Sequence, residues 1–296
     1  MRIIRADVLG FCAGVRRTVN LAREAAGRHN KRLFTMGPLI HNERVLHDLE
    51  NSGFSVLDEE ALPETLVNSI TVIRAHGIGP QLRSELTRRG TEIIDATCPN
   101  VHESQRKAQE LYEKGFTLFI AGEKKHGEVR GIQMFAPNSI VVEHKDEVSC
   151  VVKALLSRHN SEKNTIKTAI IAQTTISKPE YQSICAEIKR FFPDLTVYDT
   201  ICPATQKRQD ALAKLCPQVD AVIIAGDKAS SNTRRLLAVA EEHGKPAWIV
   251  NAASALPSER AGFGIDKFDS VGLSAGTSTP DILIDEIEQE IIRRGV

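Results

Sequence analysis

The sequence predicts an α/β protein with three similar lobes, each built on a parallel sheet and arranged with pseudo-threefold symmetry around one central site. Three observations support this prediction: a motif that recurs along the chain, apolar runs of strand length, and amphipathic stretches of helical spacing between those runs. Short buried strands that alternate with helices are typical of parallel sheets covered on both faces. We expect the lobes to span residues 1–97, 98–200 and 201–296.

The repeat is clearest between the second and third lobes. Each contains an Asp-x-x-Cys-Pro motif, at residues 95–99 and 199–203. In both lobes a glycine that ends an Ile-Ala-Gly run follows the cysteine by 24 residues, and polar residues follow it by 28, 30 and 76 residues. The first lobe repeats more loosely, with 25 residues between Cys12 and Gly37. Agreement at several landmarks indicates a true internal repeat, in which each lobe carries a cysteine, an early polar loop and a late polar loop.

The third lobe shows the expected order of elements best. We expect strands near 195–199, 220–225, 246–250 and 270–273, and helices near 204–215, 233–243 and 280–294. Leu236 and Ala240 belong to one apolar stripe at helical spacing, and Leu283 and Ile287 belong to another. Ligand sites in parallel sheets gather beyond the carboxyl ends of the strands. The landmarks of all three lobes follow predicted strands, so we expect them to face one centre.

Composition excludes several classes of function. The 296 residues include 38 Lys+Arg and 38 Asp+Glu, so the chain lacks the broad positive field of nucleic-acid or membrane-surface binders. Its apolar runs are far shorter than the ~20 residues of a membrane span. The N-terminus has no apolar segment typical of a secretory signal. We therefore expect a cytoplasmic protein that binds neither nucleic acid nor membrane, and whose six cysteines are thiols rather than disulfides.

The cysteines divide into two groups. Cys98 and Cys202 each precede a proline that opens a predicted helix, where the helix dipole favours a thiolate, and Cys12 lies between Gly10 and Gly14. Cys150, Cys185 and Cys216 lie in apolar helical stretches, where we expect small core residues. Three converging thiolates could bind a 4Fe–4S cluster or a zinc ion, or could bind no metal. In a cluster, three cysteines leave one iron open to substrate.

The polar loops narrow the choice of ligand. They supply hydrogen-bond donors but no lysine or arginine at the matched positions, a set that suits an oxyanion. These donors are His41, His76, His126, Thr174, Ser230, Ser231, Asn232 and Ser278. Glu128 is the one acid at a matched landmark, and burial beside an anion would make it a proton donor. We interpret Gly77-Ile-Gly79 as a turn rather than a dinucleotide-binding loop.

Taken together, these motifs resemble the LytB-type hydroxymethylbutenyl diphosphate reductases over residues 10–281. The resemblance rests on an ordered set: residues 10–15 (Gly-Phe-Cys-Ala-Gly-Val), 37–42 (Gly-Pro-Leu-Ile-His-Asn), 75–77, 95–99, His126 with Glu128, 173–175, 201–205, 230–233 and 275–281. It implies a three-lobed fold around a 4Fe–4S cluster held by Cys12, Cys98 and Cys202 with one open iron.

The resemblance also implies the reaction. The enzyme would reduce 4-hydroxy-3-methylbut-2-enyl diphosphate to isopentenyl and dimethylallyl diphosphates, the last step of the methylerythritol phosphate pathway. The substrate hydroxyl would bind the open iron, with Thr174 giving a hydrogen bond and Glu128 the proton. The diphosphate would be bound by His41, His76, His126, Ser230, Ser231, Asn232 and Ser278. Reduced ferredoxin or flavodoxin would be the electron donor.

Two departures from the family pattern and two alternatives remain. The family often has proline where this chain has Gly127, and histidine where it has Glu123, so we expect a looser loop and weaker substrate affinity. One alternative is a quinolinate-synthase-like dehydratase, which also joins three α/β lobes around a three-cysteine cluster. The other is a non-enzymatic zinc or redox-sensing thiolate protein.

Overall fold

The computed structural model describes residues 1–28, 30–158, 166–257 and 264–294. Within those ranges every strand belongs to one of three four-stranded sheets, and all the strand pairs are parallel. The predicted α/β class and its three parallel sheets are therefore confirmed. The chain divides into two compact units: Met1–Arg16, Ile40–Ser52 and Pro203–Val296 form unit 1, and Arg17–Leu39 and Gly53–Cys202 form unit 2.

Sheet A lies in unit 1. Its strands run in the order β11 (Ala247–Val250), β10 (Ala221–Ala225), β12 (Ser270–Ala275) and β1 (Arg2–Arg5). Side chains alternate along β10: Val222 and Ile224 pack with α8 (Pro203–Leu215) and α9 (Ser231–Glu242), whereas Ile223 packs with α10 (Asp281–Arg294) on the other face. Unit 1 also contains α2 (Glu43–Asn51) and the short 3₁₀ helices η3 (Cys216–Gln218), η4 (Ala253–Ala255) and η6 (Ile265–Lys267).

Sheets B and C lie in unit 2. Sheet B has the order β3 (Phe54–Leu57), β2 (Arg32–Met36), β4 (Ser69–Ile73) and β5 (Glu92–Asp95), with α3 (Pro80–Arg88) beside it; α1 (Ala13–Ala26) begins in unit 1 and continues into unit 2. Sheet C has the order β7 (Ile140–Val142), β6 (Thr117–Ala121), β8 (Thr168–Ala172) and β9 (Thr196–Val197). Its covering elements are α4 (Pro99–Glu113), α5 (Gly127–Gln133), η1 (Lys145–Glu147), α6 (Val148–Arg158) and α7 (Lys178–Lys189).

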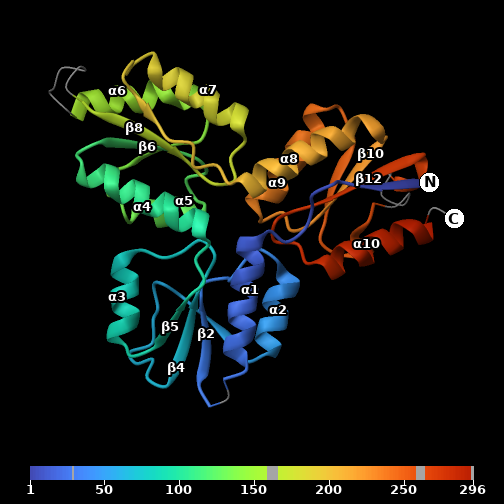
Figure 1. The fold of residues 1–296 in the computed structure, drawn as a ribbon, viewed down its shortest axis with the longest axis horizontal. Helices are drawn as coiled ribbons and strands as arrows, with labels where there is room; N and C mark the ends of the chain where they lie inside the picture. The colour runs from blue at the N-terminus through green and yellow to red at the C-terminus, as the bar shows by residue number, and fades with distance from the viewer. Residues whose placement is uncertain (29, 159–165, 258–263, 295–296) are drawn as a thin grey trace. The chain divides into compact units, whose positions relative to one another are not determined.

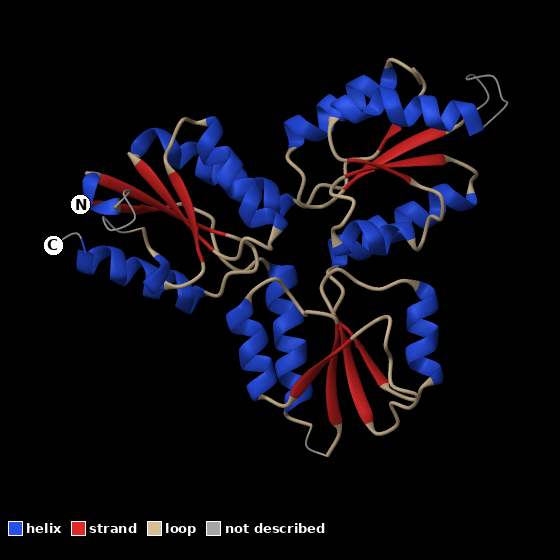
Figure 2. Cartoon of the chain, turned by 180° about the vertical axis from the view of Figure 1, so that it is seen from behind, coloured by secondary structure: helices blue, strands red, loops and turns tan. Residues whose placement is uncertain are grey.

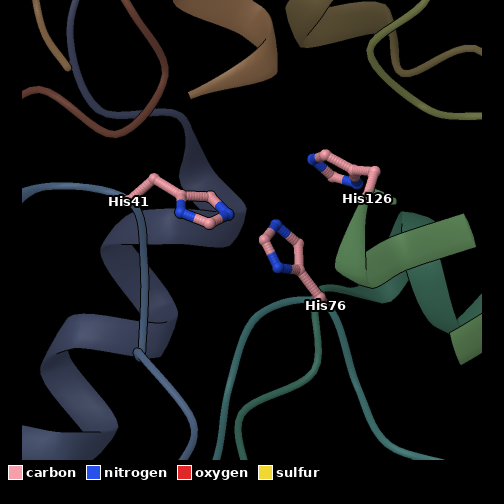
Figure 3. A group of neighbouring side chains, drawn as sticks. All are labelled: His41, His76 and His126. Carbon is pink, nitrogen blue, oxygen red and sulfur yellow. The ribbon is translucent and has the colours of Figure 1, made fainter. Parts of the chain in front are cut away.

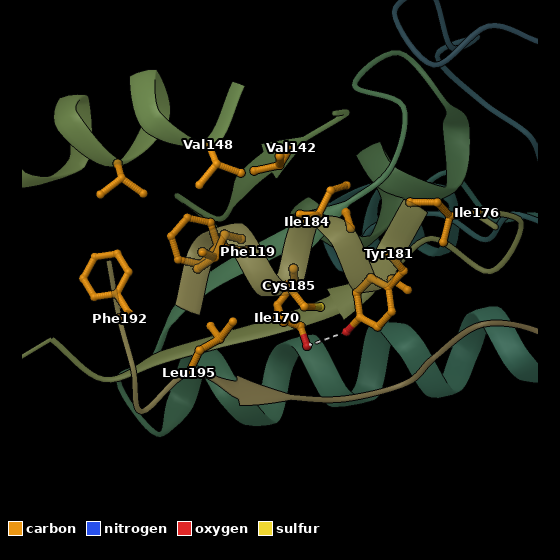
Figure 4. Packing of buried hydrophobic residues seen from close by; sticks show 14 of the residues in the cluster. Phe119, Val142, Val148, Ile170, Ile176, Tyr181, Ile184, Cys185, Phe192 and Leu195 are labelled. Carbon is orange, nitrogen blue, oxygen red and sulfur yellow. Dashed lines mark hydrogen bonds between the residues drawn. The ribbon is translucent and has the colours of Figure 1, made fainter. Parts of the chain in front are cut away.

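Helices cover both faces of sheet C, with α4 and α5 on one side and α6 and α7 on the other (Figure 1; the same layers appear from behind in Figure 2). The two faces have separate apolar cores. Phe119 packs against Phe192 under α6 and α7, with ring centroids 6.2 Å apart (Figure 4). The Tyr181 hydroxyl in the same core donates to the carbonyl oxygens of Ile170 and Tyr198, at 3.2 and 2.7 Å. Burial of the strands on both faces explains their continuous apolar runs.

The three sheets have the same spatial order of strands, but sheet A takes one of its strands from a different part of the chain. In sheets B and C the fourth strand, β5 or β9, is the last in sequence; in sheet A the fourth position is taken by β1 from the N-terminus. Residues 2–5 therefore belong to the third sheet, whereas we predicted them in the first lobe. Pairing of Ile3 with Val271 completes a sheet that residues 203–296 leave one strand short.

The elements expected in the third lobe are present within two residues of their predicted ends. The strand expected at 195–199 is β9 (Thr196–Val197), which pairs with β8 in sheet C and so does not belong to the third lobe's sheet A. Among the described residues, no helix combines the length and the apolar character required to cross a bilayer.

Candidate functional site

Three cysteines occupy equivalent positions in the three sheets. Cys12, Cys98 and Cys202 each follow the fourth strand of their sheet, β1, β5 and β9 respectively. The backbone N–H of each donates to a carbonyl oxygen in the late loop of the same sheet: Cys12 to Thr277 at 3.2 Å, Cys98 to Ala75 at 2.9 Å and Cys202 to Thr174 at 2.9 Å. The same hydrogen bond thus fixes each cysteine beside the predicted late polar residue.

Each of these cysteines also directly precedes a helix. Cys98 is the N-cap of α4, Cys202 precedes α8, and both helices begin with proline, as predicted. Cys12 precedes α1, a helix for which we made no prediction. Two of the sulfurs accept hydrogen bonds within their unit: Cys12 Sγ from the Val15 N–H at 3.4 Å, and Cys202 Sγ from Asn100 Nδ2 at 3.1 Å.

The remaining cysteines are not part of this arrangement. Cys185 and Cys216 are buried in apolar cores, as predicted, and burial raises the pKa of the Cys185 thiol to about 11. The prediction for Cys150 was wrong, because its side chain is exposed. Val148, Val152 and Leu155 form the stripe of α6 that faces the core. Cys150 lies between them in sequence and so falls on another face of the helix.

Glu128 and Thr174 form a buried pair in unit 2. Glu128 lies in the first turn of α5 and is 1% exposed; Thr174 follows β8 and is 5% exposed. The Thr174 N–H donates to Glu128 Oε1 and the Thr174 hydroxyl to Oε2, both at 2.7 Å. Burial raises the pKa of Glu128 to about 7, although both bonds from Thr174 act in the opposite direction. A carboxyl group in this state can give up a proton near neutral pH.

His126 and His76 lie together at the start of α5. His126 is the N-cap of this helix, and its Nδ1 accepts the Glu128 N–H at 3.2 Å. In the neutral ring the proton is therefore on Nε2, so that nitrogen is a donor. The His76 ring, from the loop after β4, meets the His126 ring edge-to-face with centroids 4.9 Å apart (Figure 3). The late loop of sheet B and the early loop of sheet C thus place two predicted donors side by side.

Gln173 connects the early and late loops of sheet C, a role that we did not predict for it. It is 1% exposed; its Oε1 accepts the Glu123 N–H at 2.8 Å, and its Nε2 donates to Thr175 Oγ1 at 2.7 Å. This buried amide joins the early loop to the late loop beside Thr174. The Gln-Thr-Thr run at 173–175 was the available signal.

The early loop of sheet A, in unit 1, leads into α9. Ser230 is the N-cap, and its hydroxyl accepts the Thr233 N–H. Ser231 and Asn232 form the first turn, and both are 2% exposed. Asn232 Oδ1 and Nδ2 are buried without a hydrogen-bond partner among the described residues. Because unpaired buried polar atoms are costly, this amide indicates a place for a polar ligand at a helix N-terminus.

The late loop of the same sheet carries Ser278, which is 6% exposed and donates to the carbonyl oxygen of His41 at 3.0 Å. His41 precedes Asn42, whose side chain caps α2 by accepting the Val45 N–H. The segment before Cys12 is held by Arg208 in α8, whose Nε and Nη2 donate to the Gly10 carbonyl oxygen at 3.1 and 2.7 Å. These bonds hold the segments that carry His41, Ser278 and Cys12 in unit 1.

The structure therefore places the predicted residues in two sets. Unit 2 holds Cys98, Cys202, His76, His126, Glu128 and Thr174, and unit 1 holds Cys12, His41, Ser230, Ser231, Asn232 and Ser278. Their convergence on a single centre stays a prediction. The donor set fits a soft metal group, because three cysteines at equivalent strand ends supply sulfur and no disulfide joins them in the described part of the chain.

Comparison with known proteins agrees with this reading. A family model described as LytB protein matches residues 3–292. The chain is 40% identical to the 4-hydroxy-3-methylbut-2-enyl diphosphate reductase of Treponema denticola, with 99% of each chain covered. It is 34% identical to the protein of the same name from Caldanaerobacter subterraneus, covering 98% of this chain and 96% of that one.

Solved structures give the same result. The E-1-hydroxy-2-methyl-but-2-enyl-4-diphosphate reductase of Plasmodium falciparum matches with a TM-score of 0.86 and 26% identity, covering 97% of this chain and 87% of that one. A second structure, described as (E)-4-hydroxy-3-methyl-but-2-enyl diphosphate reductase, matches with a TM-score of 0.68 and 32% identity over 99% of this chain and all of the other. On sequence and fold alike, the chain belongs to the LytB family.

Proposed function

We propose that this chain reduces 4-hydroxy-3-methylbut-2-enyl diphosphate to isopentenyl and dimethylallyl diphosphates, the last step of the methylerythritol phosphate pathway. The chain is an oxidoreductase of an iron–sulfur family. The observation that carries the proposal is the repetition of one cysteine environment in all three sheets, with the same N–H bond to the late loop each time. A reductase needs a redox centre, and three matched cysteines are a donor set that can hold an iron–sulfur cluster.

Cys12, Cys98 and Cys202 are the proposed ligands of a 4Fe–4S cluster. The fit rests on three thiols in matched positions, each at the start of a helix, and on the N–H groups that point at two of the sulfurs. When bound, such a cluster supplies electrons one at a time and an iron with no protein ligand that can act as a Lewis acid. Reduced ferredoxin or flavodoxin is the proposed electron donor.

Glu128 is the proposed proton donor. Removal of the hydroxyl group consumes two electrons and two protons: one proton leaves with the hydroxyl as water, and the other ends on an allylic carbon. The first comes from the Glu128 carboxyl, whose two oxygens Thr174 holds in place. With its pKa raised to about 7, Glu128 is substantially protonated at neutral pH, and burial limits exchange of that proton with bulk water.

The diphosphate is the proposed ligand of His41, His76, His126, Ser230, Ser231, Asn232 and Ser278. Neutral donors suit it, because a hydrogen bond to an anion is stronger than one between neutral groups. The unpaired Asn232 amide and the Nε2 proton of His126 support this assignment from unit 1 and unit 2 respectively. Ser231 and Asn232 in unit 1 and His126 in unit 2 are buried, and hydrogen bonds to an anion are stronger in buried surroundings than in water.

Dye-driven turnover tests the proposal. Anaerobically purified protein, reduced by methyl viologen, should convert the hydroxylated allylic diphosphate to both products. Glu128→Gln should retain its iron and bind the substrate but lose most of the turnover, since an amide cannot supply the proton. Glu113→Gln, an exposed change on α4, is the matched control and should react like the wild type. Wild-type turnover by Glu128→Gln would remove the proton-donor role, and an iron-loaded wild type without turnover would refute the activity.

A further inference from the structure

One side-chain amide points at a proposed cluster ligand. Asn100 is the second residue of α4, and its Nδ2 lies 3.1 Å from Cys202 Sγ, with the amide N–H as donor. Both residues belong to unit 2. The backbone of Asn100 is fixed within the helix, where its carbonyl accepts the Ser104 hydroxyl at 3.1 Å. The Cys202 N–H is bound to Thr174, so both the sulfur and the backbone of this cysteine are held.

The internal repeat makes this contact asymmetric. Asn100 follows Cys98 by two residues; the equivalent positions after Cys12 and Cys202 are Gly14 and Ala204. Neither glycine nor alanine has a side chain that can donate a hydrogen bond. Of the three matched positions, only the one in α4 can therefore send a side-chain donor to the cysteine of another sheet end. The asymmetry comes from the sequence and not from the shared topology.

Hydrogen bonds to cluster sulfurs tune reduction potential. Reduction adds a negative charge to the cluster and its thiolates, so an N–H donor stabilises the reduced form more than the oxidised form. Loss of such a donor lowers the potential and makes the cluster harder to reduce. Asn100 is itself exposed, so its replacement leaves the apolar cores intact.

We propose that Asn100 tunes the reduction potential of the iron–sulfur centre through an N–H···S bond to Cys202. Asn100 acts through the cysteine and is a positioning residue. The inference rests on the proposed cluster ligands. The N–H···S bond gives Cys202 an electronic environment that Cys12 and Cys98 do not receive from their matched positions. The bond raises the reduction potential of the cluster, which favours electron transfer from the donor protein.

The test compares midpoint potentials of anaerobically purified full-length variants by EPR-monitored redox titration. Asn100→Leu removes the donor at similar size, and Asn100→Asp replaces it with a negative charge at the same shape. Both should shift the midpoint to lower potential, Asn100→Asp further, with iron content equal to that of the wild type. Gln109→Leu removes an exposed amide further along α4 and should leave the potential unchanged. An Asn100→Leu potential equal to that of the wild type would overturn the proposal.

A second measurement detects the bond directly. In wild-type protein whose asparagine side chains carry ¹⁵N, pulsed EPR of the reduced cluster should detect one weakly coupled amide nitrogen, and Asn100→Leu should lack it. Absence of any coupled asparagine nitrogen in the wild type would contradict the bond directly. Wild-type protein that contains no iron–sulfur cluster would instead refute the proposed function itself, so the two failures are distinguishable.

Discussion

Thr174 binds Glu128 through both carboxylate oxygens, with its N–H on Oε1 and its hydroxyl on Oε2, each at 2.7 Å. The same residue accepts the Cys202 N–H on its carbonyl oxygen. One short loop after β8 therefore fixes the proposed proton donor and one proposed cluster ligand. A shift of this loop would displace both groups, which couples the site of protonation to the redox site within unit 2.

The raised pKa of Glu128 makes stability depend on pH. Its pKa rises from 4.5 to about 7 on folding, so the native state binds a proton more tightly than the unfolded chain does. The stabilisation is complete below pH 4.5 and is lost as pH rises to about 7, a change of about 3 kcal/mol as an upper bound. Chemical denaturation of the apoprotein at several pH values measures this change in unfolding free energy. Glu128→Gln, which lacks the titrating carboxyl group, is the control. A pH-independent difference between the two proteins would refute the raised pKa.

Thr174→Val should raise the pKa of Glu128 further. The hydroxyl bond stabilises the carboxylate, so removing it favours the protonated acid, while the backbone N–H bond remains. In a plot of the dye-driven rate against pH, the basic limb should move to higher pH. Thr174→Ser, which keeps the hydroxyl group, should return the basic limb to its wild-type position. The profile of Thr174→Val should also show slower turnover, because the acid is held by one bond instead of two. A basic limb that moved to lower pH would contradict this account.

Asn232→Leu should have opposite effects on stability and on binding. The substitution replaces two unpaired buried polar atoms with methyl groups on a side chain of the same branching, so the ligand-free protein should gain about 1–2 kcal/mol of unfolding free energy. Affinity for inorganic diphosphate should fall roughly tenfold or more, because that amide no longer contacts the anion. Calorimetry measures both effects. Asn251→Leu, an exposed change in unit 1, should alter neither. A destabilised Asn232→Leu protein with unchanged affinity would show that the amide is structural.

Gly127→Pro should stabilise the start of α5. Gly127 is the first helical residue, where proline is favoured, and His126 has φ −69° and ψ 136°, a conformation compatible with a following proline. The unfolding free energy should rise by ~0.4–1 kcal/mol, after a small adjustment of the His76 ring, which lies 3.3 Å from the position of an added Cβ. Gly127→Ala serves as the control for side-chain bulk alone. Equal destabilisation by both substitutions would mean that contact with His76 dominates.

Cys98→Ser should lose most of the iron and the visible absorbance of anaerobically purified protein, because a hydroxyl group is a poor ligand for iron–sulfur clusters. Cys150→Ser changes an exposed thiol outside the matched positions and should retain both. Iron and acid-labile sulfide assays quantify the difference. Comparable iron in the two variants would remove Cys98 from the ligand set.

Sequence reasoning predicted the fold well wherever apolar periodicity and the repeat agreed. The strands around Ile120 and Ile224, and the helices that begin at Pro99 and Pro203, were identifiable because burial and proline position leave strong local signals. The membership of Arg2–Arg5 in sheet A was not, since pairing between the two ends of a chain leaves no local trace.

Candidate site residues were predictable where the repeat matched them. The contact from Asn100 to Cys202 was not, because the equivalent positions hold glycine and alanine and the repeat carries no signal there. The exposure of Cys150 was missed because a thiol in an apolar stretch looks like a core residue until the orientation of α6 is known.

The most direct test of the central claim is the metal content of anaerobically purified wild-type protein, measured together with its Mössbauer spectrum. The account predicts about four irons and four sulfides per chain, with one iron site distinguishable from the other three because it lacks a cysteine ligand. A colourless protein that contains zinc, or one in which all four irons are equivalent, would contradict it.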